Sequence, residues 1–133
     1  MANAIYPIWK QELMQGTANT SLAGTVKVAL VDTGVYTYSA AHDFVDDLST
    51  SRVGTDQTLG TKTFTNGTFD AADATWPAVT GATAEALVIY IDTGTAGTSR
   101  LVAFLDTGIT GLPVTPNGGN ITATWDAAGI FTL

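Results

Sequence analysis

Two short runs in the chain are apolar at every position: "ALVIYI" at residues 86–91 and, after Arg100, "LVAFL" at residues 101–105. Successive side chains of a β-strand point to opposite faces of a sheet, so a strand with no polar alternation has to be covered on both faces. We therefore expect these runs in the middle of a sheet or sandwich and not at its edge.

Three other stretches predict shorter strands. The run "TVKVALV" at residues 25–31 alternates well enough to form one strand. The stretch "TKTFTNGTFDA" places Asn66-Gly67 between two Thr/Phe runs, which is the strongest short-range hairpin signal in a sequence. The final "NITATWDAAGIFTL" predicts two short strands around a turn at residues 126–129.

The sequence also predicts two short helices. Pro7 to Gln15 fits the first, because Pro7 suits a first helical turn, Ile5, Trp9 and Leu13 recur every four residues, and Gly16 is placed to end it.

The second predicted helix covers "SAAHDFVDDLS" at residues 39–49. Ser39 can cap its N-terminus, and Ala41, Phe44, Val45 and Leu48 form an apolar stripe at helical spacing.

These elements predict an all-β fold: a single β-sandwich or jelly-roll-like domain with a short N-terminal helix and one further short helix. Residues 1–20 are expected to form an N-terminal arm with the short helix, and residues 21–133 the β-domain. The length of 133 residues fits one domain with one core.

Composition narrows the range of functions. The chain has no cysteine, which rules out disulfides and thiolate metal sites. Its net charge of −7 argues against binding nucleic acid, and no apolar stretch reaches the ~20 residues that span a bilayer, so no membrane partner is expected. Only 13% of residues are charged, and Thr, Gly and Ala are abundant. This balance favours a surface that is partly covered by assembly into something larger.

Asp-Thr-Gly occurs three times after apolar residues, at Asp32, Asp92 and Asp106. Aspartic proteases present their catalytic carboxylate in this way, but they need two carboxylates that share a proton. Three copies do not match that arrangement, and Asp92 and Asp106 lie at opposite ends of one apparent hairpin, whose intervening strand holds them well apart. We predict turns instead, in which Asp accepts backbone amides and Gly adopts positive φ. Residues 32–34 are expected to close a three-residue hairpin loop.

No other residues form a strong catalytic, cofactor or metal motif, so we expect a non-enzyme without cofactors. His42 is the only histidine, and a solvated or capping role is expected for it. The aspartates lack the alternating loop of a calcium motif; they are Asp43, Asp46, Asp47, Asp70 and Asp73.

The aromatic residues leave one alternative open. Trp9, Trp76 and Trp125 are scattered in the sequence and are expected to serve core packing or subunit contacts. A row of such rings on the surface would instead indicate a glycan-binding β-sandwich module.

The N-terminal arm is the candidate partner-binding segment, because it crowds large apolar side chains into a helix too short to be stable alone. The residues concerned are Ile5, Tyr6, Ile8, Trp9 and Leu13. We predict that they bind a neighbouring subunit or another partner, so that removing residues 1–15 leaves a soluble β-domain that assembles or binds more weakly. If the arm folds on its own core instead, the truncated chain fails to fold.

Nearly the whole chain resembles a family of small structural proteins of tailed bacteriophages. The resemblance is carried by "YPIWKQELMQG", "VKVALVDTGVYTYSAAHDF", "GTKTFTNGTFDAADATW", "LVIYIDTG" and "LVAFLDTGITGLPVTPNGGNITATWDAAGIF". It implies a capsid decoration (cement) protein, made in the host cytoplasm and located in the virion, that binds the major capsid protein as a homotrimer. A position in the tail or a fibre is the alternative.

Overall fold

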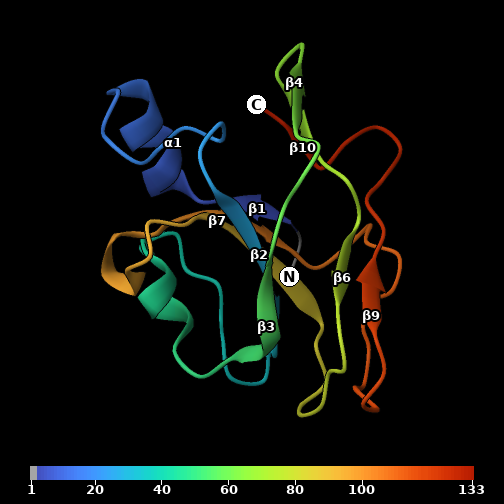
Figure 1. The fold of residues 1–133 in the computed structure, drawn as a ribbon. Coiled ribbons are helices and arrows are strands. Elements are labelled where there is room, and N and C mark those ends of the chain that lie inside the picture. The colour runs from blue at the N-terminus through green and yellow to red at the C-terminus, as the bar shows by residue number, and fades with distance from the viewer. Residues whose placement is uncertain (1–2) are drawn as a thin grey trace.

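The main sheet of the computed structural model, which describes residues 3–133, has five antiparallel strands (Figure 1). Their order across the sheet is β1 (Ala4–Ile5), β8 (Arg100–Leu105), β7 (Ala86–Ile91), β2 (Val26–Val31) and β3 (Arg52–Thr58).

Strand β7 is the centre of this sheet, between β8 and β2. All six of its residues are buried, and in β2 and β8 only the first polar positions, Lys27 and Arg100, keep partial exposure. The expectation that both apolar runs lie inside a sheet is confirmed.

Each face of the sheet needs its own cover. The segment after β2 covers one face, where the rings of Tyr36 and Tyr38 lie 6.1 and 5.7 Å from that of Phe104 on β8. Strand β3 packs against a two-stranded sheet of β6 (Ala74–Trp76) and β9 (Ile121–Ala123), and Trp76 joins the same hydrophobic core. Figure 1 shows this pair and the 45–48 segment on opposite sides of the main strands. The fold is therefore all-β and sandwich-like, as predicted.

A third sheet contains the predicted hairpin, with the order β10 (Phe131–Thr132), β5 (Thr68–Asp70) and β4 (Thr63–Thr65). Asn66 and Gly67 both have positive φ, +53° and +78°, as a two-residue type I′ turn requires. The predicted strands around residues 126–129 are also present, but β9 and β10 belong to different sheets.

Helix α1 (Pro7–Met14) confirms the first predicted helix to within one residue, and Gly16 follows it at φ +70°. The preceding strand β1 pairs with β8, and the Tyr6 amide donates to the Val102 carbonyl at 2.9 Å. Tyr6 and Trp9 are buried in the same hydrophobic core as the main strands. The N-terminal arm thus shares its core with the β-domain.

The second predicted helix is mostly wrong, because only Val45–Leu48 forms one turn of 3-10 helix. The Asp47 carboxylate accepts the amides of Asp43 and Phe44, which holds the chain extended just before Val45. Phe44 also forms a β-bridge with Arg100. Pairing with a distant strand therefore overrides the local helical spacing. Ser39 caps only a turn, by accepting the Ala41 amide at 3.2 Å.

The predicted hairpin at residues 32–34 is also wrong. A turn is present, since the amides of Val35 and Tyr36 donate to the Asp32 carbonyl. Gly34 does not have positive φ, and no strand follows it directly. The chain instead crosses over the sheet face and returns to β2 as β3.

The buried arm changes what removal of residues 1–15 is expected to do. We predict that this deletion prevents cooperative folding, and that Trp9→Ala alone lowers the free energy of unfolding by about 3–5 kcal/mol. Val35→Ala, at an exposed position, should change it by less than about 0.5 kcal/mol. Urea unfolding measures all three, and a stable, cooperatively folded deletion variant would contradict this prediction.

Candidate functional site

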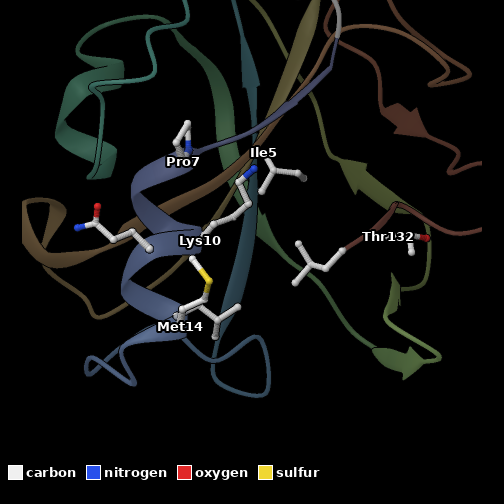
Figure 2. Close-up of a pocket in the computed structure, with 8 residues that line it drawn as sticks. Ile5, Pro7, Lys10, Met14 and Thr132 are labelled. Atoms are coloured by element: carbon white, nitrogen blue, oxygen red, sulfur yellow. The ribbon is translucent and has the colours of Figure 1, made fainter.

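An apolar surface lies between helix α1 and the β4–β5 hairpin; we call it the α1–β4 surface. It consists of three adjoining hollows of about 530, 250 and 140 Å³. Leu133 lines all three, Leu13 joins the first to the second, and Leu22 and Phe64 join the second to the third. In Figure 1 the C-terminus lies between α1 and the hairpin, and Figure 2 shows side chains from α1 and Thr132 around the largest hollow.

Most of the large apolar side chains that are exposed among the described residues lie on the α1–β4 surface. Four such side chains are exposed: Met14, Phe64, Leu133 and Val35, with exposed fractions of 82, 51, 59 and 55%. The first three line the surface, and Val35 does not. Single exposed apolar residues are ordinary, but a contiguous group of them indicates a contact site.

Aromatic packing holds the floor of this surface in place. The Phe64 ring stacks on Phe69 at a centroid distance of 5.7 Å, Phe69 lies 5.4 Å from Phe131, and Phe131 meets Trp9 edge-on at 6.1 Å. The Leu133 amide donates to the Gly67 carbonyl at 3.0 Å, which ties the last residue to the hairpin turn. The apolar rim is therefore presented on a fixed base.

The α1–β4 surface is nearly free of charge. Seventeen residues line its hollows, and the one ionisable side chain among them is that of Lys10. Nearby, the Lys62 ammonium donates to the Leu22 carbonyl at 2.8 Å and also to the Gly24 carbonyl. None of the twelve Asp and Glu side chains lines this surface, although the net charge is −7.

The five predicted partner-binding residues divide between this surface and the core. Ile5 and Leu13 line the α1–β4 surface, while Ile8 is half-buried and lines none of its hollows. Tyr6 is fully buried, and Trp9, whose indole nitrogen donates to the Thr20 carbonyl at 2.9 Å, shows only an edge in the second hollow.

Sequence reasoning missed two of the most exposed members of the surface, Phe64 in a three-residue strand and Leu133 at the end of the sequence. Met14 was not among the predicted partner-binding residues, although its place beside the stripe at Leu13 leaves it without cover. Only the alternation of Thr63-Phe64-Thr65 carried a signal, and it did not show whether the Phe side chain would be covered.

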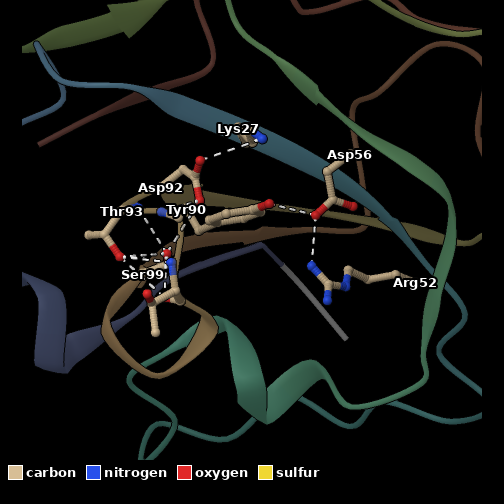
Figure 3. A network of polar contacts seen from close by, with 9 residues as sticks. Lys27, Arg52, Asp56, Tyr90, Asp92, Thr93 and Ser99 are labelled. Carbon is tan, nitrogen blue, oxygen red and sulfur yellow. Dashed lines mark hydrogen bonds and ion pairs between the residues drawn. The ribbon is translucent and has the colours of Figure 1, made fainter.

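In two of the three Asp-Thr-Gly triplets the aspartate accepts a backbone amide as predicted, but only the second also has its glycine at positive φ, Gly94 at +87°. Asp32 accepts the Gly34 amide at 2.8 Å, and Asp92 accepts the Gly94 amide at 3.1 Å. Asp92 also pairs with Lys27 at 3.5 Å, within the polar network that Figure 3 shows around Tyr90 and Ser99. These two carboxylates thus hold loops at strand ends.

The third triplet is held by another residue. The Asn3 side-chain oxygen accepts the amides of Asp106 and Thr107 at 2.7 and 3.0 Å, and Gly108 has φ +75°. Because β2 and β8 both run antiparallel to β7, Asp32 and Asp106 lie at one end of these strands and Asp92 lies at the opposite end. The predicted separation of Asp92 from Asp106 is confirmed.

A buried chain of hydrogen bonds joins two tyrosines to the only histidine. The Tyr6 and Tyr36 hydroxyls lie 2.7 Å apart, and the Tyr36 hydroxyl lies 2.8 Å from His42 Nδ1. Burial raises the pKa of Tyr36 to about 12, and burial raises the pKa of Tyr6 still further. His42 is therefore hydrogen-bonded to a core tyrosine. The solvated or capping role predicted for it did not include this contact.

Within residues 3–133, the tryptophans and the acidic residues considered above do not come together in a glycan or metal site. Trp9, Trp76 and Trp125 are all buried, which confirms the packing role predicted for them. No group of three or more histidine, aspartate or glutamate side chains in that range is arranged to hold a metal ion. Within the same residues no helix is long and apolar enough to cross a membrane.

Comparisons with protein-family models and with curated proteins give no match. Any assignment of function to this chain is therefore a proposal from its own residues, their geometry and the resemblance stated above.

The raised tyrosine pKa values predict a loss of stability in alkali. In the unfolded chain Tyr36 ionises near pH 10, whereas in the folded chain it stays protonated up to about pH 12. The free energy of unfolding therefore falls as the pH rises from the unfolded to the folded pKa of Tyr36. One tyrosine lowers it by up to about 1.4 kcal/mol per pH unit. We predict that Tyr36→Phe, measured by urea unfolding from pH 9 to 12, flattens this decline. An unchanged slope would contradict the prediction.

Proposed function

We propose that the protein is a non-enzymatic structural component of a tailed-bacteriophage virion, and that it acts as a homotrimeric decoration protein on the outside of the assembled capsid. The observation that carries the proposal is the α1–β4 surface, where Met14, Phe64 and Leu133 are exposed side by side. Such a surface is costly in water unless a partner covers it.

The fixed base beneath this surface supports a role in assembly. Binding costs less when the contact residues are already ordered. The Phe64–Phe69–Phe131 ring contacts and the bond from Leu133 to the hairpin provide that order. The low content of charged residues, 13%, agrees with a subunit that has much of its surface in contact with neighbours.

The carboxylates that first indicated protease chemistry support a structural role. Asp32 and Asp92 each accept a backbone amide two residues on, and Asp92 also pairs with Lys27. In these positions they stabilise strand ends, as Asp does in many turns. This use is consistent with a protein selected for stable packing.

The partner in this proposal is the major capsid protein, together with copies of this chain. The family resemblance motivates the choice of the capsid, and a position in the tail or a fibre is the alternative. The two differ in copy number, because decoration follows the many identical units of the capsid lattice whereas a tail carries few copies of most components.

Mass spectrometry of purified particles tests the proposal. We predict that peptides of this chain are present in hundreds of copies per particle, with the major capsid protein in the same digest as the internal reference. A handful of copies would indicate a tail or fibre component instead. Complete absence from purified particles would refute a virion role.

A further inference from the structure

We infer that the α1–β4 surface is the contact between copies of this chain. The inference rests on the proposed structural role and names the partner that covers the surface. Three features of the surface favour a second copy as its partner: its extent, the charge of its side chains, and the unpaired edge of the strand beside it.

The extent of the surface approaches that of a stable subunit contact. Of the seventeen described residues that line its three hollows, fifteen keep exposed area, since only Trp9 and Phe69 are buried. A standard interface uses roughly 20–30 residues on each side, so the surface supplies more than half of such a contact before its rim is counted. The largest hollow, of about 530 Å³, also has room for side chains of a second copy, such as the flexible Met14.

The charge distribution favours a second copy over a basic partner. With a net charge of −7, two copies of this chain repel each other across most orientations. Among the described residues, the α1–β4 surface brings no Asp or Glu side chain opposite another, because Lys10 carries the one ionisable side chain of its lining. A basic partner would gain more from a face that carries carboxylates.

Strand β4 adds an unpaired edge next to this surface. Within residues 3–133 it is the last strand of its sheet and pairs only with β5, and all three of its residues are exposed. An unpaired edge is a template for a strand of another chain, although a strand of three residues offers only a few backbone groups. Thr63-Phe64-Thr65 carries no charge and no proline, and Lys62 just before it donates to the Leu22 and Gly24 carbonyls, so this short edge adds a few backbone donors and acceptors to the contact.

Sedimentation velocity over a range of concentrations tests this inference. We predict that the wild-type chain forms oligomers, and that Met14→Asp and Phe64→Asp each weaken self-association at least tenfold. Val35→Asp is the matched control, because Val35 is as exposed as Phe64 but lines none of the three hollows. It should leave self-association unchanged. Circular dichroism melting checks that all three variants stay folded.

Thiol labelling gives a second measurement that does not depend on disrupting the contact. Because the chain has no cysteine, each single-cysteine variant has one reactive group. Labelling of Met14→Cys and Thr65→Cys should slow down as protein concentration rises, whereas labelling of Val35→Cys should not.

The outcomes separate this inference from the proposed function. A wild-type chain that stays monomeric at high concentration, or oligomers that both aspartate variants leave intact, would overturn the inference. A chain abundant in particles but monomeric in solution would refute self-association through this surface and keep the virion role. A chain that forms the predicted oligomers but is absent from particles would support self-association through this surface and refute the virion role.

Discussion

The structure depends on the burial of β7 from both faces. Its six residues "ALVIYI" are all inside, between β2 and β8, so neither face of the main sheet can be left to solvent. Each of its four large aliphatic side chains, Leu87, Val88, Ile89 and Ile91, contributes about 1.5–3 kcal/mol when it is removed from water. The Tyr36 and Tyr38 rings, helix α1 and the small sheets are the elements that provide this cover. The α1–β4 surface is the apolar area that this arrangement leaves uncovered.

The parts of the fold that could be predicted are those encoded by neighbouring residues. The apolar runs of β7 and β8, the Asn66-Gly67 turn and helix α1 each have a local physical cause. The predictions were wrong where a residue distant in the sequence determines the local structure. Residues 39–49 have helical spacing, but the bridge from Phe44 to Arg100 joins them to a strand far along the chain. Likewise, residues 32–34 do not form a hairpin, because β2 takes its partners β3 and β7 from later in the chain.

The candidate site was predicted only in part, for the same reason. The four-residue spacing of Ile5, Trp9 and Leu13 shows that α1 has an apolar face, but it does not show what covers that face. The core covers Trp9 almost completely, and Ile5 and Leu13 are left at the rim. Met14, Phe64 and Leu133 complete the surface from three distant parts of the chain, which the fold alone brings together.

We propose that the molecule assembles through this uncovered end. Hydrogen–deuterium exchange of the wild-type chain at low and high concentration is the decisive test, because it reports which amides become covered without any substitution. We expect added protection at high concentration in helix α1 and on the outer edge of β4, with no change at residues 33–38. Protection that is unchanged in α1 and β4, or that increases only at residues 33–38, would contradict it.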